Sequence, residues 1–338
     1  MSPAGNVALA VDLGGTKVAA AVVSSQGEIL VRVQEPTNQE GPIPLIAQIT
    51  RLLQSLVAQR SLAAGEIQGV GIGIPAVLEP ETDFVIWGPN LHGWRNIDLR
   101  GAVQHVLGVP VYVEYDGHTA VLGEYWQGAG RGYDSIAMLI VGTGIGGGLV
   151  MDGRLVRGHD RLAGAAGWFA LTTQADASDP RGQSLGHWES LAAGPGIARR
   201  AVELLPDYPY SSLKALPAEQ ITARIIFEAA RQGDALAQRV VHETAQLLGL
   251  GVANVVSLVN PQIVVLGGSI GCQPELLSPV KEVVIRWAQP ASGSSVRIVN
   301  SQLGPDAGLF GAAYAVWIRT ESDQASATHD GNSKTERR

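Results

Sequence analysis

Residues 8–23 read ALAVDLGGTKVAAAVV: an apolar run ends in an aspartate, a Gly-Gly turn follows, and a second apolar run begins. The two glycines allow a tight turn and let backbone N–H groups approach an anion closely. A strand pattern rather than a helix follows the turn, and the motif GxxxxGK[ST] is absent, so this is not a P-loop. The stretch predicts a phosphate-binding hairpin, although an ordinary hairpin turn is the better interpretation for the segment taken alone.

Polar residues around this turn suit a nucleotide. Thr16 and Lys17 supply a hydroxyl and an ammonium group, and Asp12 can face a hydrated cation such as Mg²⁺. The candidate nucleotide-binding residues here are Asp12, Gly14, Gly15, Thr16 and Lys17.

Residues 135–150, SIAMLIVGTGIGGGLV, repeat the same design of strand, glycine-rich turn and strand. Gly142, Gly144 and Gly147 formally satisfy GxGxxG, but the dinucleotide fingerprint requires a helix after its last glycine. Residues 149–156 instead read as a strand and a turn, which excludes a dinucleotide-binding site here.

A third glycine turn, at residues 267–268, follows an apolar strand and precedes a helical segment. Two such hairpins and a later Gly-Gly turn resemble the actin-like ATPases, an α/β fold of two ribonuclease H-like lobes. The resemblance implies a nucleotide in the interlobe cleft, with its phosphates between residues 14–17 and 142–146. It adds these candidate cofactor residues: Thr143, Gly144, Gly146, Gly267 and Gly268.

Length and composition agree with a chain of two lobes. A chain of 338 residues with 46% apolar content exceeds the usual single-domain size. The net charge of −7, without a basic stripe, argues against nucleic acid as a partner. One cysteine, Cys272, excludes an internal disulfide. No signal-peptide pattern and no apolar run of the roughly 18–20 residues needed for a membrane span is present. We expect a cytoplasmic protein with no membrane partner.

Element patterns place the lobe boundaries. The order of strands and helices through residue 128 predicts a first lobe at 1–130, to which a terminal helix at about 309–320 returns. The second lobe is expected at 131–308, with helices at 189–205, 218–232 and 235–259. Residues 321–338 are polar and lack periodicity, which predicts a disordered tail.

The chain resembles the ROK family of sugar kinases and sugar-responsive repressors over roughly residues 7–320. The motifs that carry the resemblance are DLGGTK at 12–17, GIGIP at 71–75, PNLHGW at 89–94, GTGIGGG at 142–148, NPQ at 260–262 with the later Gly-Gly pair, and LGPDAGL at 303–309. Their common order and spacing, more than any single motif, identify the family.

Kinases of this family use one aspartate as a base, and the resemblance implies that this residue is Asp116. The family pattern Asn-Asp-Ala-Asn reads Tyr115-Asp116-Gly117-His118 here. Asp116 is expected where a strand ends and a helix begins, so the positive helix end would help to keep it ionised. It would accept the proton of the attacking hydroxyl. The alternative is a simple helix N-cap.

The chain departs from the family at the sugar clamp Glu-x-Gly-His, which reads Ala165-Ala166-Gly167-Trp168 here. The family's structural zinc is bound by that histidine and three cysteines. This chain has Trp168 in place of the histidine and lacks the three cysteines, so we expect no structural zinc and no other metal site. The residues expected to contact the acceptor are Pro75, Asn90, Tyr115, Trp168, His187 and Glu189.

Two functions remain in competition. The first is an ATP- and Mg²⁺-dependent kinase that acts on a hydroxyl of a modified hexose, an amino sugar, a cyclitol or a glycoside. The flat faces of Tyr115 and Trp168 would stack on the acceptor. The second is a non-catalytic sugar- or nucleotide-binding regulatory protein on the ROK scaffold. In either case the partner is a small sugar-like molecule, and the resemblance also implies a possible homodimer.

Overall fold

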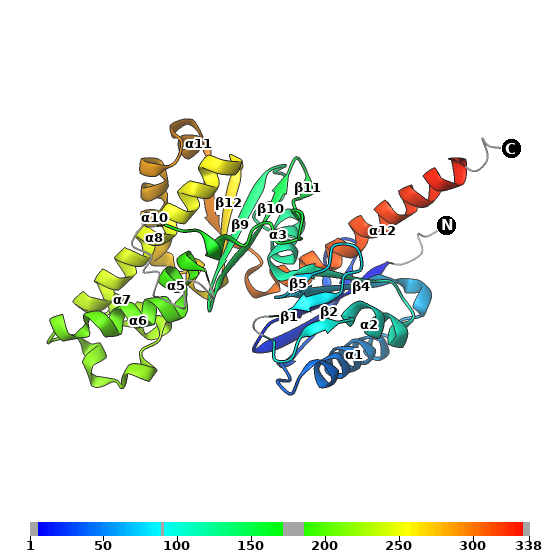
Figure 1. Cartoon of the computed structure of the whole chain (residues 1–338), viewed down its shortest axis with the longest axis horizontal. Coiled ribbons are helices and arrows are strands. Elements are labelled where there is room, and N and C mark those ends of the chain that lie inside the picture. Colours follow the sequence, from blue (N-terminus) through cyan, green and yellow to red (C-terminus); the bar gives the residue numbers. More distant parts are fainter. Residues whose placement is uncertain (1–5, 89–90, 172–185, 334–338) are drawn as a thin grey trace. The chain divides into compact units, whose positions relative to one another are not determined.

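The computed structural model describes residues 6–88, 91–171 and 186–333, with side chains up to residue 320 (Figure 1). The chain forms two compact units. Unit 1 consists of Met1–Arg131, Arg157–Ala163 and Pro305–Arg338, and unit 2 of Gly132–Val156 and Gly164–Gly304. Within the described residues, no helix is long and apolar enough to cross a membrane.

Unit 1 is built on a five-stranded sheet in the order β3-β2-β1-β4-β8. The first three strands are antiparallel, and β4 and β8 continue parallel to β1. The strands are β1 (Val7–Leu13), β2 (Lys17–Ser24), β3 (Ile29–Pro36), β4 (Ile67–Ile74) and β8 (Val111–Tyr115). The hairpin of β1 and β2 confirms the strand-turn-strand reading of residues 8–23.

The helices of unit 1 cover both faces of this sheet. They are α1 (Pro42–Gln59), α2 (Leu99–Leu107), α3 (Asp116–Gln127) and α12 (Ala307–Ser333). A small antiparallel sheet, absent from the sequence prediction, joins β4 to α2 and consists of β5 (Val77–Leu78), β6 (Val85–Trp87) and β7 (Arg95–Ile97).

Side-chain size along β1 decides which helix packs on which face. Leu9 and Val11 pack with Leu45 and Ile49 of α1 in one buried cluster. The intervening alanines of β1 pack instead with residues of α12, including Leu309. Small side chains allow α12 to approach the sheet closely, and Figure 1 shows α1 and α12 on opposite faces.

Helix α12 extends beyond the expected terminal helix of about 309–320 and continues to Ser333. Its first turns are fixed by packing on α3 and the sheet, and extending a formed helix costs much less than starting one. The intervening residues include alanine, glutamate and glutamine, which have good helix propensity. Residues 334–338 lie outside the described part of the chain.

Unit 2 repeats the sheet design, in the order β11-β10-β9-β12-β13. Three antiparallel strands are again extended by two parallel ones. The strands are β9 (Ile136–Val141), β10 (Ile145–Met151), β11 (Arg154–Leu155), β12 (Ile263–Gly267) and β13 (Arg297–Asn300). Because β10 follows the glycine turn directly, the rejection of a dinucleotide site is confirmed.

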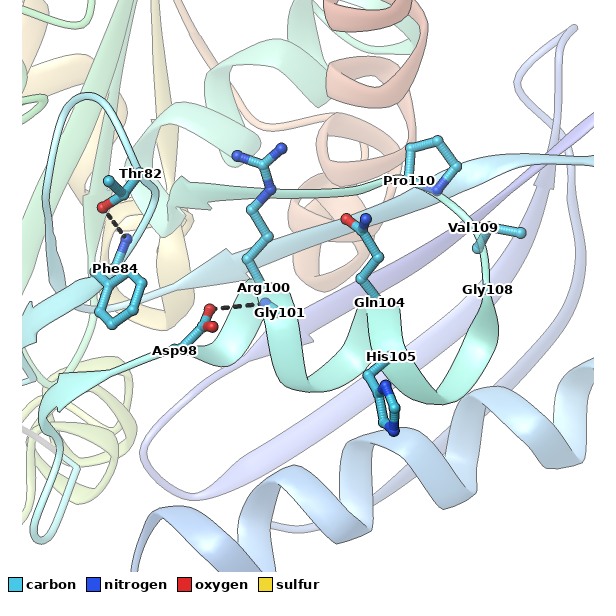
Figure 2. A pocket seen from close by; sticks show the side chains of 10 residues that line it. All are labelled: Thr82, Phe84, Asp98, Arg100, Gly101, Gln104, His105, Gly108, Val109 and Pro110. Carbon is cyan, nitrogen blue, oxygen red and sulfur yellow. Dashed lines mark hydrogen bonds between the residues drawn. The ribbon is translucent and has the colours of Figure 1, made fainter.

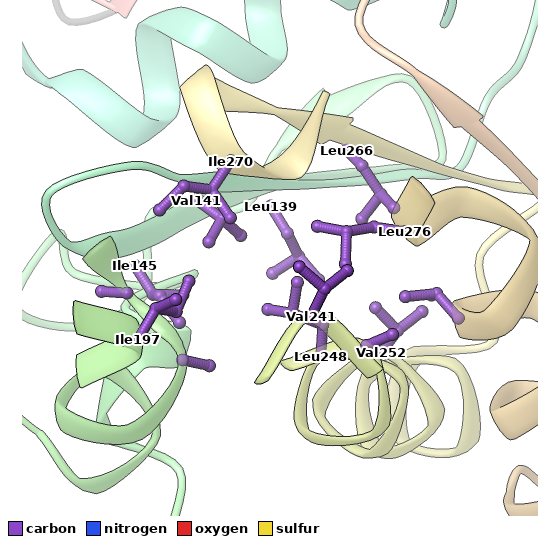
Figure 3. Packing of buried hydrophobic residues seen from close by; sticks show 14 of the residues in the cluster. Leu139, Val141, Ile145, Ile197, Val241, Leu248, Val252, Leu266, Ile270 and Leu276 are labelled. Atoms are coloured by element: carbon purple, nitrogen blue, oxygen red, sulfur yellow. The ribbon is translucent and has the colours of Figure 1, made fainter. Parts of the chain in front are cut away.

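The helices of unit 2 pack against its sheet and bury a hydrophobic core with it. They are α5 (His187–Ala192), α6 (Gly194–Leu204), α7 (Ala223–Arg231), α8 (Ala235–Val259), α9 (Gly268–Gly271), α10 (Pro274–Trp287) and α11 (Pro290–Ser295). Figure 3 shows Leu139 and Leu266 of the sheet in one cluster with Leu248 and Val252 of α8.

Two helix predictions in unit 2 had wrong boundaries. The expected helix 189–205 is two helices, because Ala193 is extended and α6 begins at Gly194, with Pro195 in its first turn. The expected helix 218–232 begins only at Ala223, where Thr222 accepts a hydrogen bond from the Ile225 amide. The prediction of 235–259 is confirmed without change.

Candidate functional site

The glycine turn of unit 1 is held from its carbonyl side. Thr37, which follows β3, donates its hydroxyl to the carbonyl of Gly14 at 2.7 Å and its amide to that of Thr16 at 3.0 Å. Gln39 donates to the carbonyl of Gly15 at 2.7 Å. Among the described residues, the amides of Gly15 and Thr16 have no protein acceptor. The turn therefore has two backbone donors available to an anion.

Asp12 lies at the end of β1, half-buried beside the turn. Burial raises the pKa of its carboxyl to about 6, and Asp306 adds to the rise while Lys17 and Arg32 oppose it. Helix α12 starts against this carboxyl, because a Cβ on Gly308 would come within 2.7 Å of its carbon and oxygen. The position of Gly308 therefore requires glycine.

Asp116 is the first residue of α3 and accepts the amide of Gly117 at 2.8 Å. Burial raises the pKa of the Asp116 carboxyl to about 7, and the carboxylate of Asp12 contributes to the rise. The sequence indicated that the helix end would keep Asp116 ionised. In the structure, desolvation and a like charge outweigh that effect.

The carboxyl ends of three neighbouring strands bring the unit 1 candidates to one edge of the sheet. Asp12 pairs with Gly73 in the ladder, and Tyr115 pairs with Ile74, so Pro75 follows at the same level. In parallel α/β sheets this is the edge at which ligands bind. Asn90 lies outside the described residues.

In unit 2 the turn at Thr143 and Gly144 is supported by Glu189. The carboxylate of Glu189 accepts the Ile145 amide at 2.7 Å, and a Cβ on Gly144 would lie 2.6 Å from the same oxygen. Burial raises the pKa of the Glu189 carboxyl, and the Ile145 amide opposes the rise. Sequence reasoning gave Glu189 a role toward the acceptor and missed its support of the turn.

The second glycine turn of unit 2 lies at the same edge of its sheet. Gly267 pairs with Ile140 at the end of β9, one strand away from the Thr143 turn. Gly268 has φ +82°, and a Cβ there would collide with the carbonyl of Val141. Gly146 lies further along, in β10, and is half-buried.

The acceptor candidates of unit 2 lie at a 3₁₀ turn and at the start of α5. His187 accepts the Leu171 amide at its Nδ1 at 3.2 Å, so the neutral ring carries its proton on Nε2 and can donate it. Trp168 ends a single 3₁₀ turn, Ala166–Trp168, and is 56% exposed. Its indole face is available for stacking.

Trp188 anchors the start of α5, and no local pattern in the sequence indicates this role. It is fully buried, stacks on Phe169 at 5.8 Å and donates its indole N–H to the carbonyl of Leu247 at 3.0 Å. Gly251 of α8 makes room for the ring, because a Cβ there would collide with it. The neighbours of Trp188, His187 and Glu189, thereby receive a fixed backbone.

A groove of about 880 Å³ runs beside α2 in unit 1 (Figure 2) and contains none of the predicted site residues. Two of its charged groups already have partners. Asp98 accepts the Gly101 amide at 2.7 Å, and Arg100 lies 3.5 Å from Asp83. The candidate site therefore remains at the sheet edges. The groove is lined by Thr82, Phe84, Asp98, Arg100, Gly101, Gln104, His105, Gly108, Val109 and Pro110.

Comparisons with known proteins agree with these motifs. The ROK family model matches residues 8–319. A glucokinase of Halalkalibacterium halodurans is 34% identical over 313 residues, which cover 90% of this chain and 93% of the relative.

Solved structures give the same result. The ROK hexokinase of Thermus thermophilus is similar with a TM-score of 0.79 and 28% identity, over 94% of this chain and 99% of the other. A ROK family glucokinase of Streptomyces griseus, solved in complex with glucose and AMPPNP, has a TM-score of 0.73 and 30% identity, over 91% and 98%. The chain belongs to the ROK family, has the actin-like ATPase fold, and is an ATP-dependent carbohydrate kinase.

Proposed function

We propose that this chain transfers the γ-phosphoryl group of ATP to a hydroxyl of a modified hexose, an amino sugar, a cyclitol or a glycoside, with Asp116 as the base. One observation carries the assignment of the base. Asp116 stands at the carboxyl edge of the sheet, beside Asp12, with a pKa raised to about 7. A general base works best when its pKa lies near the operating pH.

The proposed reaction is an in-line displacement. The acceptor oxygen forms a bond to the γ-phosphorus while the bond to the ADP oxygen breaks, and the hydroxyl proton passes to a carboxylate oxygen of Asp116. The Gly117 amide, 2.8 Å from Oδ1, fixes the orientation of that carboxylate. In such a loose transition state, catalysis depends mainly on positioning and electrostatics.

The phosphates are proposed to contact both glycine turns. The amides of Gly15 and Thr16, which have no acceptor in the described part of the chain, and the ammonium group of Lys17 provide donors in unit 1. Thr143 and Gly144 provide the matching turn in unit 2, and Gly267 and Gly268 are proposed to lie nearer the nucleoside.

Mg²⁺ is proposed to arrive with ATP, and the donor set fits it. The negative charge of Asp12 raises the cost of ionising Asp116, and a divalent cation would offset that charge. Asp12 would contact the water shell of the ion. The ion supplies charge neutralisation for the phosphates, and Asp12 orients it.

Acceptor choice is proposed to differ from that of the relatives named glucokinases. The clamp's glutamate and histidine are absent at Ala165 and Trp168. Each lost hydrogen bond to a charged group weakens binding by about 1.5–3 kcal/mol. Oε1 of Glu189 and Nε2 of His187 remain for hydroxyls, and Trp168 offers an exposed stacking face.

An ADP-release screen with ATP and Mg²⁺ tests this proposal. Glucose, glucosamine, N-acetylated hexosamines, inositol and methyl β-glucoside are compared, and a substituted acceptor should exceed glucose by about tenfold or more in kcat/KM. The variant carrying Ala165→Glu and Trp168→His should raise kcat/KM for glucose, whereas Trp287→His, at another exposed tryptophan, should not. Glucose as the best acceptor at micromolar KM would refute the altered pocket.

The sequence also left open a regulatory protein that binds without turnover, and the kinase relatives disfavour that alternative. The same screen separates the two. Saturable binding of ATP and a sugar, with no ADP released from any acceptor, would favour the regulatory protein.

A further inference from the structure

Glu114 of β8 is the centre of a buried ion cluster in unit 1. Its side chain is 1% exposed, and its Oε1 accepts from Nε and Nη2 of Arg157 at 2.9 and 2.7 Å. The same oxygen lies 3.2 Å from Arg161 and 3.3 Å from Arg319 of α12. Burial alone raises the pKa of Glu114, but His118 and the arginines outweigh it and hold that pKa well below its usual range.

Asp83 is the second carboxylate of the cluster. It is fully buried, pairs with Arg161, and lies 3.3 Å from Arg319. Arg161 is 3% exposed and also donates to the carbonyl of Val113 at 3.1 Å. The Glu114 cluster is defined as Asp83, Glu114, Arg157, Arg161 and Arg319.

Two members of the cluster have an unfavourable backbone conformation. Asp83 has φ +62° and Arg161 has φ +57°, in the left-handed region that favours glycine. Such residues cost of order 1–3 kcal/mol each, and a buried ion pair is often no more stable than apolar residues of the same volume. Stability alone therefore gives little reason for a strained and buried Asp83–Arg161 pair, which points to a role in positioning.

Two of the arginines fix one short segment. Arg157–Ala163 belongs to unit 1, whereas the chain before and after it belongs to unit 2. Arg157 holds the start of this segment and Arg161 its middle. The residues that follow directly are 164–168, which carry Ala165 and Trp168 of the proposed acceptor site.

His118 connects the end of the segment to the base. Its Nε2 lies 3.0 Å from the carbonyl of Ala163, and its Nδ1 lies 3.5 Å from Oε2 of Glu114. Glu114 and His118 are four residues apart and flank Asp116 in the sequence. The ring of His118 also meets Tyr115 edge-on, at 5.3 Å. The first turn of α3 therefore lies against the same carboxylate that binds the segment, through the 3.5 Å contact of His118.

We propose that Glu114 is a positioning residue for phosphoryl transfer: it fixes both the first turn of α3, which carries Asp116, and the segment Arg157–Ala163, which leads to the acceptor residues. The inference rests on the proposed function for its kinetic consequence. The structural part of the inference, that one carboxylate orders two segments, does not depend on the proposed function.

The test compares Glu114→Gln, Arg157→Met and a control, Arg51→Met. Arg51 makes a comparable two-point ion pair with Glu35, but it is exposed and far along the chain from the cluster. In the full chain, below the unfolding temperature of each variant, Glu114→Gln should lower kcat at least about tenfold with the KM for ATP within about twofold. Arg157→Met should act in the same direction, and Arg51→Met should match the parent chain. Misplacement by about 1 Å is enough for losses of this size.

Hydrogen exchange gives the second readout. Amides in 116–119 and 157–163 should exchange at least about tenfold faster in Glu114→Gln and Arg157→Met, with the sheet strands unchanged. Unchanged exchange in both segments would overturn the proposal, as would a normal kcat in both variants. If Glu114→Gln does not fold, Arg157→Met decides the question, because Arg157 is one-third exposed and Glu114 keeps two other arginines. If the parent chain has no phosphotransferase activity, the proposed function fails and the exchange result alone decides the positioning.

Discussion

Replacing the proposed base should make the protein more stable. Asp116→Asn keeps the shape of the side chain, and the amide oxygen can still accept the Gly117 N–H, now 2.8 Å from the carboxylate. The change removes the charge that burial and Asp12 both disfavour. We therefore expect a gain in unfolding free energy in the absence of ligand.

The size and pH dependence of that gain follow from the pKa. The folded Asp116 carboxyl titrates at about 7 and the unfolded one near 3.8, so the folded state binds more protons between these values. The parent chain then loses stability relative to Asp116→Asn as pH rises through this window. At 1.36 kcal/mol per pH unit the full difference is about 4 kcal/mol. Asp116 is only half-buried, and Asp12 can change its own protonation when Asp116 ionises. Both effects reduce the difference, so we expect a gain in unfolding free energy of about 1–3 kcal/mol above pH 7.

Urea unfolding of both chains from pH 4 to 8 measures the effect. The gain of Asp116→Asn should be absent near pH 4, grow through pH 5–6 and level off above pH 7, and ATP with Mg²⁺ should reduce it. Asp98→Asn, at the N-cap of α2, is the matched control, because aspartate and asparagine cap equally well. A gain that is the same at every pH, or a loss of stability at pH 8, would refute the argument.

Three further predictions concern other parts of the chain. Bulky residues at both Thr16 and Thr143 should abolish the thermal stabilisation given by ATP, and undiminished protection would contradict the phosphate placement. Elemental analysis should find well under one zinc per chain. A stoichiometric, chelator-resistant zinc would contradict the prediction that the chain lacks the family's zinc site. Glycine at Asp83 or at Arg161 alone should cost about 1.5–3 kcal/mol, because the remaining buried charge loses one of its partners, whereas the double variant should cost less than the sum; additive losses would show that the pair is uncoupled.

Local patterns predicted the sheet edges well. The glycine turns and the position of Asp116 at a strand-to-helix junction depend on neighbouring residues in the sequence. Hydrophobic patterns and turn-forming residues were therefore enough to find them. The equivalence of the two sheets was likewise visible as a repeated strand-turn-strand segment.

Long-range features were not predictable in this way. Asp83 and Arg161 are 78 positions apart, and nothing near either residue signals a buried pair. The supports of the turn, Thr37 and Gln39, follow a strand that meets the turn only through sheet pairing. The raised pKa of Asp116 comes first from its burial and then from the charge of Asp12 on another strand, so a helix-end argument alone gave the wrong direction.

The most direct test of the central claim measures phosphoryl transfer with and without the base. The purified chain is incubated with ATP, Mg²⁺ and its best acceptor, and the phosphorylated product is quantified by mass spectrometry alongside ATP affinity. Asp116→Asn should lower kcat at least about a hundredfold and leave ATP affinity within about threefold. An Asp116→Asn chain that forms product at a near-normal rate would contradict the assignment of Asp116 as the base.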